Sequence, residues 1–353
     1  MVVLCGLAAE LHGFSASSRA YWISRRPTKR GIGVDGNGLG IGVVGTGDGR
    51  AEGTGVKREP SRSSELPAQA LVASSAAVAA LMSFQAGSLA RRGVASTTTA
   101  FACGVVAAVG CAALEARTKR TRRVKISGAL ASQALLGGLM PHLAFFAIPR
   151  AGLAVANCLM FTMPLWTGVF AACTGAPWSS RDTITALVSL AGVVLVVDPL
   201  TGASIFSPWG SLAALAFGTC GGALNVLVQS AGALQGTSPN VLTSTQMLAC
   251  ALIAAPFLGS GGPVIRTHLR TEALALTGVG CLMATQNTLR VRGLQLSALP
   301  SVATLLYLEI LFCCLLDVLA LGTRPRPTQI LGAALIVGGA LLNAAAATSE
   351  GEG

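Results

Sequence analysis

The sequence predicts an all-α polytopic membrane protein with ten transmembrane helices, arranged as two inverted five-helix repeats. Of the 353 residues, 52% are hydrophobic and only 11% are charged, whereas soluble domains carry about 25% charged residues. The charged residues stand at the ends of long apolar stretches, and a sequence pattern recurs between the two halves. This composition excludes an ordinary soluble domain and a wholly disordered chain.

The first half of the chain has room for five membrane-spanning helices, each of which needs about 20 apolar residues. We expect one helix in each uncharged stretch, namely between Glu65 and Arg91, Arg92 and Glu115, Lys125 and Arg150, Arg150 and Arg181, and Asp182 and Asp198. The last stretch is short. Its helix is therefore expected to begin near Trp178-Ser179-Ser180 or to let Arg181 reach the membrane interface.

The second half has room for five more helices. They are expected at 208–231, at 241–259, between Glu272 and Arg290, at 298–321 and at 327–349. The chain then divides into two units, 66–199 and 207–348, with a tail at 1–65 and a short tail at 349–353. No nucleophile and base, metal-ligand spacing or CxxC pair accompanies these helices, so we expect no enzyme activity, no metal and no cofactor.

The tail at 1–65 is expected to be a disordered, glycine-rich and basic segment. Its two GxGxxG matches begin at Gly31 and Gly40. A dinucleotide site requires that motif between a strand and a helix, which this low-complexity sequence does not offer. Residues 11–30 are rich in Ser and Arg and contain no acidic residue. That composition is typical of an organelle transit peptide, so a chloroplast location is one alternative and a basic cytoplasmic tail is another.

The basic residues indicate the orientation in the membrane. Residues 115–125 hold six basic residues and one acidic residue, and such clusters favour the cytoplasmic side. We therefore expect both termini on that side. A nucleic-acid partner is not predicted, because the cluster lacks interleaved aromatic residues. The expected partners are the lipid bilayer and a small solute, and the sequence leaves the oligomeric state open.

An internal repeat links the two halves. In the runs FFAIPRAGLAVANCLMFTMPLWTGVFA and LQLSALPSVATLLYLEILFCCLL, Pro164 and Ile310 stand 146 residues apart. The runs SLAGVVLVV and QILGAALIVGGALL follow, and there Gly192 and Gly338 keep the same offset. Because five is odd, two consecutive five-helix units must enter the membrane from opposite sides, as in secondary transporters.

These runs resemble the paired repeats of EamA-type members of the drug/metabolite transporter superfamily. The second also resembles branches related to solute carriers of nucleotide sugars. The resemblance covers about residues 66–348 and implies a carrier of a small organic solute that works by alternating access. The family usually has a Gly-Glu pair where this chain has Gly175-Ala176 and Gly322-Thr323. The missing acids favour the alternative, a non-transporting scaffold or regulator that retains the fold.

Ionisable residues inside a membrane are functional candidates by default. Glu309 stands in the middle of the ninth expected helix and would bind a cationic group or carry a proton, or else bridge two helices as a neutral acid. His142 follows Pro141 and is either a proton relay or a satisfied core residue. The other candidates for binding or proton coupling are Gln286, Asn287, Tyr307 and Asn157.

The basic residues also bear on the class of solute. No Lys lies inside an expected span, and the Arg residues stand at expected helix ends. Phosphate groups are usually held by Arg or Lys. The sequence therefore favours a neutral, zwitterionic or cationic solute over a phosphorylated one, unless Arg290 or Arg292 turns inward.

Overall fold

The computed structural model describes nine stretches of the chain: 65–118, 128–151, 153–175, 178–197, 207–230, 237–258, 269–296, 302–321 and 326–349. Every regular element in these stretches is a helix, which confirms the all-α fold class. The expectations about the N-terminal tail, its GxGxxG motifs and the transit peptide lie outside the described residues.

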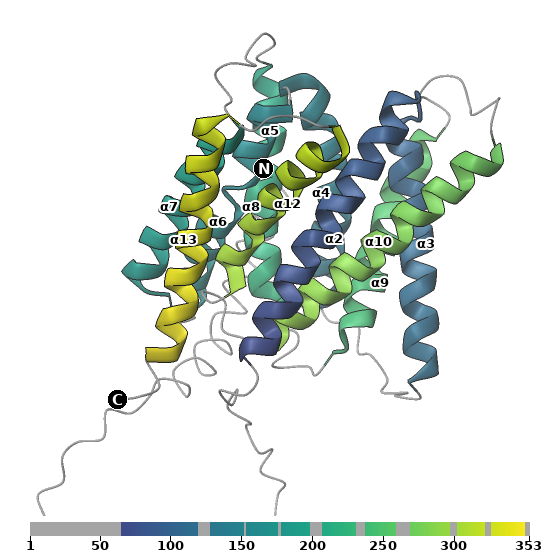
Figure 1. Cartoon of the computed structure of the whole chain (residues 1–353). Coiled ribbons are helices and arrows are strands. Elements are labelled where there is room, and N and C mark those ends of the chain that lie inside the picture. The colour runs from purple at the N-terminus through teal and green to yellow at the C-terminus, as the bar shows by residue number, and fades with distance from the viewer. Residues whose placement is uncertain are drawn as a thin grey trace, which may run out of the picture.

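The helices lie side by side in one bundle (Figure 1). In the first half they are α2 (Glu65–Arg91), α3 (Ser96–Arg117), α4 (Gly128–Ala151), α5 (Leu153–Met160), α6 (Met163–Thr174) and α7 (Ser180–Val197). In the second half they are α8 (Pro208–Ser230), α9 (Pro239–Ala254), α10 (Leu269–Leu296), α12 (Leu308–Leu321) and α13 (Pro327–Ser349). Two short 3-10 helices complete the set, η3 (Ala255–Phe257) after α9 and η4 (Thr304–Tyr307) before α12.

Seven described helices are long and apolar enough to cross a membrane: Leu66–Ala90, Ser96–Arg117, Gly128–Ile148, Val155–Thr174, Ser180–Val197, Pro208–Gln229 and Pro239–Phe257. The chain is thus a multi-pass membrane protein. Three expected spans do not meet the same criteria. The helix α10 includes four charged residues, α12 has 14 residues, and the described apolar part of α13 is Pro327–Leu342.

The start of α7 follows from local hydrogen bonds. The backbone N–H and the hydroxyl of Ser179 donate to Asp182 Oδ2 at 2.7 and 2.6 Å, and the Asp182 N–H donates back to Ser179 Oγ at 3.2 Å. This reciprocal cap satisfies donors that the first turn leaves free. Arg181 is exposed and donates to the carbonyl of Leu342 on α13. The expected start near Trp178-Ser179-Ser180 is confirmed.

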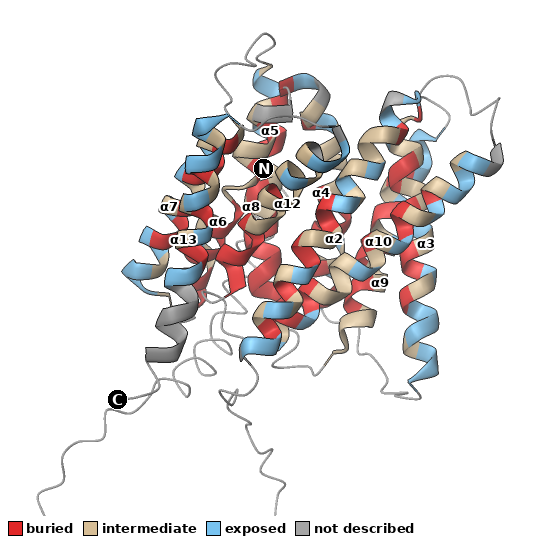
Figure 2. Cartoon of the chain, viewed as in Figure 1, coloured by how far each residue is buried: buried red, intermediate tan, exposed pale blue. Residues whose placement is uncertain are grey.

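Among the seven helices long enough to cross a membrane, α8 is the most buried. Its residues 221–229 are all buried (Figure 2). It packs against α4, α5, α6 and α10. The helix α4 also packs against α9, and α3 packs against both α9 and α10. The helix α2 packs against α10 and α12, while α7 and α13 pair with each other.

The crossing of α7 and α13 depends on two glycines. A Cβ atom placed on Gly192 would lie 2.7 Å from the carbonyl oxygen of Gly332, and one placed on Gly332 would lie 2.5 Å from that of Gly192. The two backbones can approach this closely only because neither residue has a side chain. A Cβ on Gly338 would meet no heavy atom within 4 Å. Gly338 matches Gly192 in sequence pattern, but Gly332 is its packing partner.

Candidate functional site

A buried arginine lies inside the bundle. Arg290 on α10 is 9% exposed. Its Nη2 donates to Asn225 Oδ1 on α8 at 2.7 Å and lies 3.1 Å from the sulfur of Met163 on α6. The expectation that Arg290 stands at a helix end is wrong, because α10 continues to Leu296. A buried guanidinium is costly unless it is paired, so its position indicates a functional site.

Asn225 holds Arg290 in place through a chain of hydrogen bonds. Its side chain is fully buried, and its Nδ2 donates to Thr167 Oγ1 on α6 at 3.0 Å. The Thr167 hydroxyl in turn donates to the carbonyl of Met163 at 3.0 Å. The amide therefore presents its oxygen to the guanidinium and its nitrogen to the hydroxyl. This network joins α10, α8 and α6.

Glu309 is the opposite charge in the same region. It lies in the first turn of α12, is half-buried and interacts electrostatically with Arg290. The helix α2 packs against both α10 and α12, which carry the two charges. Two opposite charges inside an apolar bundle can hold a charged group of a solute or a proton. Among the described candidates predicted from the sequence, Glu309 is the one with an electrostatic interaction with Arg290.

Tyr307 is fully buried just before α12. Its hydroxyl donates to the carbonyl of Ala186 on α7 at 3.3 Å, and its ring lies 6.3 Å from that of Phe161. Both contacts fix η4 against its neighbours. Among the described residues, no hydrogen bond joins Tyr307 to Arg290 or Glu309.

The remaining candidates lie in different settings. His142 is half-buried, and its Nε2 lies 3.1 Å from the carbonyl oxygen of Cys250 on α9. Asn287 donates to the carbonyl of Met283 in its own helix at 3.0 Å. Gln286 and Asn157 are half-buried on α10 and α5. Within the described part of the chain, none of these four hydrogen bonds to Arg290 or Glu309.

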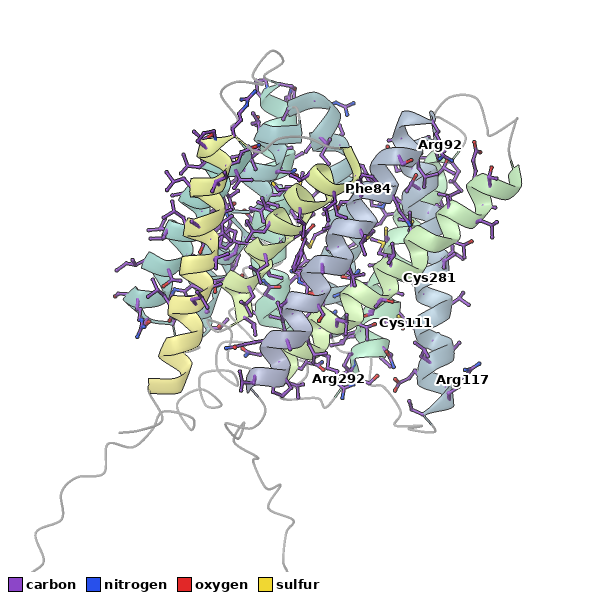
Figure 3. All side chains as sticks on the ribbon, in the orientation of Figure 1. Phe84, Arg92, Cys111, Arg117, Cys281 and Arg292 are labelled. Carbon is purple, nitrogen blue, oxygen red and sulfur yellow. The ribbon has the colours of Figure 1, made fainter. Side chains whose placement is uncertain are left out.

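Sequence reasoning placed Arg290 at a helix end and considered its turning inward only as an exception, although the spacing of the charges carried a signal. The uncharged stretch between Glu272 and Arg290 has only 17 residues, which is at the short end for a span. A helix that continues past Arg290, as α10 does, reaches the usual length of a span. Arg292 is exposed and lies near the end of α10 beside α2 (Figure 3). Residues two positions apart on an α-helix are separated by about 200° around its axis, so Arg290 and Arg292 face nearly opposite directions.

The described residues contain no cluster of three or more His, Cys, Asp or Glu side chains that could hold a metal ion. The described cysteines are free thiols.

Seven described helices that are long and apolar enough to cross a membrane define the class as a multi-pass membrane protein. Residues 208–345 match the model of the EamA-like transporter family, and the matched segment includes Arg290 and Glu309. No curated protein matches the chain.

One solved structure, described only as the crystal structure of a protein, has a TM-score of 0.64 and 22% sequence identity with this chain. The alignment covers 78% of this chain and 98% of the other. At this identity the likeness shows a shared fold alone. It extends well beyond residues 208–345, so the first half takes part in that fold too.

Proposed function

We propose that this protein moves a small organic solute across a membrane by alternating access, with Arg290 and Glu309 in its binding site. The observation that carries the proposal is the interaction of the buried Arg290 with the half-buried Glu309, both within the segment that matches the EamA-like transporter family. Polar groups at such depth are expensive and mark substrate or ion pathways. Glu309 would bind a cationic group or carry a coupled proton.

The proposed architecture is two inverted units, 66–199 and 207–348. The packing of the helices supports it, because each main contact has a counterpart in the other half. The contact of α2 with α10 corresponds to that of α8 with α4, and the contact of α3 with α10 corresponds to that of α9 with α4. Exchanging the two units turns α3 into α9 and α7 into α13, so the contact of α3 with α9 and that of α7 with α13 are each their own counterpart. In transporters built this way, solute sites lie between the repeats.

Two hydrogen bonds cross from one proposed unit to the other, that of Arg290 to Met163 and that of Asn225 to Thr167. Arg290 and Asn225 belong to the second unit, whereas Met163 and Thr167 belong to the first. A solute with an anionic group would compete for the guanidinium and weaken these bonds. Because a ligand shifts an equilibrium only by binding two states unequally, this competition would couple solute binding to movement of the units. Arg290 therefore adds anionic groups to the solute classes that the sequence favours.

The test is a thermal-shift screen of the purified protein against a metabolite panel, followed by flux measurements in proteoliposomes. Wild type, Glu309→Gln and Arg290→Gln are compared, with the exposed Arg292→Gln as the matched control. We expect a solute that stabilises wild type and the control but neither Glu309→Gln nor Arg290→Gln, and that wild type also transports. A solute that stabilises all four proteins equally would place binding elsewhere.

The alternative is a non-transporting scaffold or regulator, which the missing loop acids favour. In the structure, Gly175 ends α6 in the left-handed conformation with φ of 73°, and its N–H donates to the carbonyls of Ala171 and Ala172. The turn that ends α6 therefore forms without the glutamate that the family usually has at the position of Ala176. Absence of flux for any solute, together with a partner that co-purifies in stoichiometric amount, would support the scaffold.

A further inference from the structure

The packing of α4 against α9 sets two glycines against α9. A Cβ atom on Gly137 would lie 2.6 Å from Cγ of Gln246, and one on Gly138 would lie 2.7 Å from the backbone nitrogen of Cys250. Further along, His142 contacts the carbonyl of Cys250. Residue numbers therefore increase in the same direction along both helices.

One turn earlier, this register places two more polar residues, Gln133 and Thr243, at the same height on the two helices. Gln133 precedes Gly137 by four residues, and Thr243 precedes Gln246 by three, so each lies on the same face as its neighbour. The helix α8 runs the other way along α4, because Gly210 faces Arg150 and Gly221 faces Met140. The buried Gln229, near the end of α8, therefore reaches the level of Gln133.

Four polar atoms in this region have no hydrogen-bond partner among the described residues. They are Nε2 and Oε1 of Gln133, Oγ1 of Thr243 and Nε2 of Gln246. Gln133 and Thr243 are 0% exposed, and Gln246 is 2% exposed. Buried polar groups almost always have partners, since an unpaired one loses its bonds to water and gains none. A molecule outside the chain would supply the missing bonds.

We propose that Gln133, Thr243 and Gln246 form a binding site for neutral hydroxyl groups. The two amide nitrogens donate, the amide oxygen accepts, and the threonine hydroxyl can do either. A hydroxyl group both donates and accepts, and it matches a set of side chains without charge. Buried water and a neutral polyhydroxylated solute both offer this chemistry. The site is independent of Arg290 and Glu309 and does not rest on the proposed transport function.

The test uses the sign of the change in melting temperature. Thr243→Val is isosteric and removes the hydroxyl, and Gln133→Leu removes the amide at similar size. If hydroxyl groups occupy the site, each substitution leaves the bound molecule and the other side chains with fewer bonds, so Tm falls by roughly 2–4 °C. The double variant falls by less than the sum, because both side chains share the bound molecules. Thr243→Ser, which keeps the hydroxyl, stays closer to wild type than Thr243→Val.

The matched control is Thr99→Val. Thr99 is also buried, but its hydroxyl donates to the carbonyl of Ala95 in its own helix. The proposal requires Thr243→Val to lower Tm more than Thr99→Val does. If Thr243→Val leaves Tm unchanged or raises it, the site is dry and the proposal is wrong. Thr243→Val decides the matter even if Gln133→Leu does not fold.

A second measurement separates the two sources of the hydroxyl group. Wild type and Gln133→Leu are melted with increasing sorbitol and myo-inositol. A larger rise in Tm for wild type than for the variant indicates a solute hydroxyl in the site. Equal rises, together with the lower starting Tm of the variants, indicate buried water.

Discussion

At the residue scale, the central feature is a positive charge held by neutral groups. The guanidinium of Arg290 donates to an amide oxygen, and Glu309 supplies the opposite charge. Breaking such a buried set by removing one member is costly, because the remaining members lose their partners. We expect substitution of Glu309 to affect mainly transport, and substitution of Asn225 to affect mainly stability.

Glu309→Gln is expected to keep folding and membrane insertion, because the amide has nearly the same shape and can still form hydrogen bonds. Loss of the charge should reduce transport of a cationic or zwitterionic solute by about tenfold or more, the equivalent of one charge-assisted hydrogen bond. If Glu309 carries the coupled proton, the pH dependence of transport also disappears. Flux measured between pH 5 and 8 checks both effects. A fully active variant with an unchanged pH profile would contradict the role.

Asn225→Leu is expected to destabilise the protein strongly, since it removes the partners of Arg290 and Thr167 together. Loss of one member of a buried charged network typically costs about 3–5 kcal/mol. Asn287→Leu is the control, because Asn287 donates only within its own helix among the described residues. Thermal melts of both purified variants make the comparison. Equal losses of Tm would show that the Arg290 network contributes little.

At the element scale, close helix packing relies on small residues. Lipid chains are as apolar as leucine, so helices in a membrane gain from close contact and internal hydrogen bonds rather than from escaping water. The pair α7 and α13 shows this, with Gly192 and Gly332 in backbone contact.

Gly192→Ala is expected to lower stability by about 1–3 kcal/mol, the usual cost of overpacking. Its methyl group would lie 2.7 Å from the carbonyl oxygen of Gly332, so the two helices must move apart. Gly338→Ala on the same pair should be neutral or slightly stabilising, because its Cβ meets open space and alanine favours helix. Thermal melts in one detergent test the contrast. A larger loss of stability for Gly338→Ala than for Gly192→Ala would contradict the close contact of α7 and α13 at Gly192 and Gly332.

At the scale of the whole molecule, the basic residues at 115–125 bear on the orientation in the membrane. A helix that crosses the membrane has its two ends on opposite sides, so Arg92, just before α3, and Thr118, just after it, should lie on opposite sides. Because basic clusters favour the cytoplasmic side, we expect Thr118 in the cytoplasm.

This topology predicts different chemical accessibility for two exposed residues, Arg92 and Thr118. In intact cells, a membrane-impermeant maleimide should label Arg92→Cys from outside and reach Thr118→Cys only after permeabilisation. The unsubstituted chain, with its native cysteines, gives the background. Labelling of both residues from the same side would exclude the proposed topology.

Much of the fold could be predicted from the sequence because helix ends in a membrane coincide with charges. The bounds expected between Glu65 and Arg91, and at 327–349, agree with α2 and α13. The α10 helix extends past its expected end at Arg290, since a charge can stay inside a bundle when a neighbouring helix offers a partner. Of the residues that form the candidate site, only Glu309 was predicted from the sequence; Arg290 and Asn225 were not. Sequence pattern alone does not show which helix faces another or at what height.

Three properties follow from the order of residues alone: an apolar helical chain with basic connections, a recurring pattern in its two halves, and an acidic residue in the ninth expected span. These properties depend on which residues stand next to each other along the chain. The tertiary structure alone decided that Arg290 turns inward to Asn225, and that the unpartnered side chains of Gln133, Thr243 and Gln246 lie on neighbouring helices. Those contacts depend on the rotation and relative height of the helices, which packing between distant parts of the chain fixes.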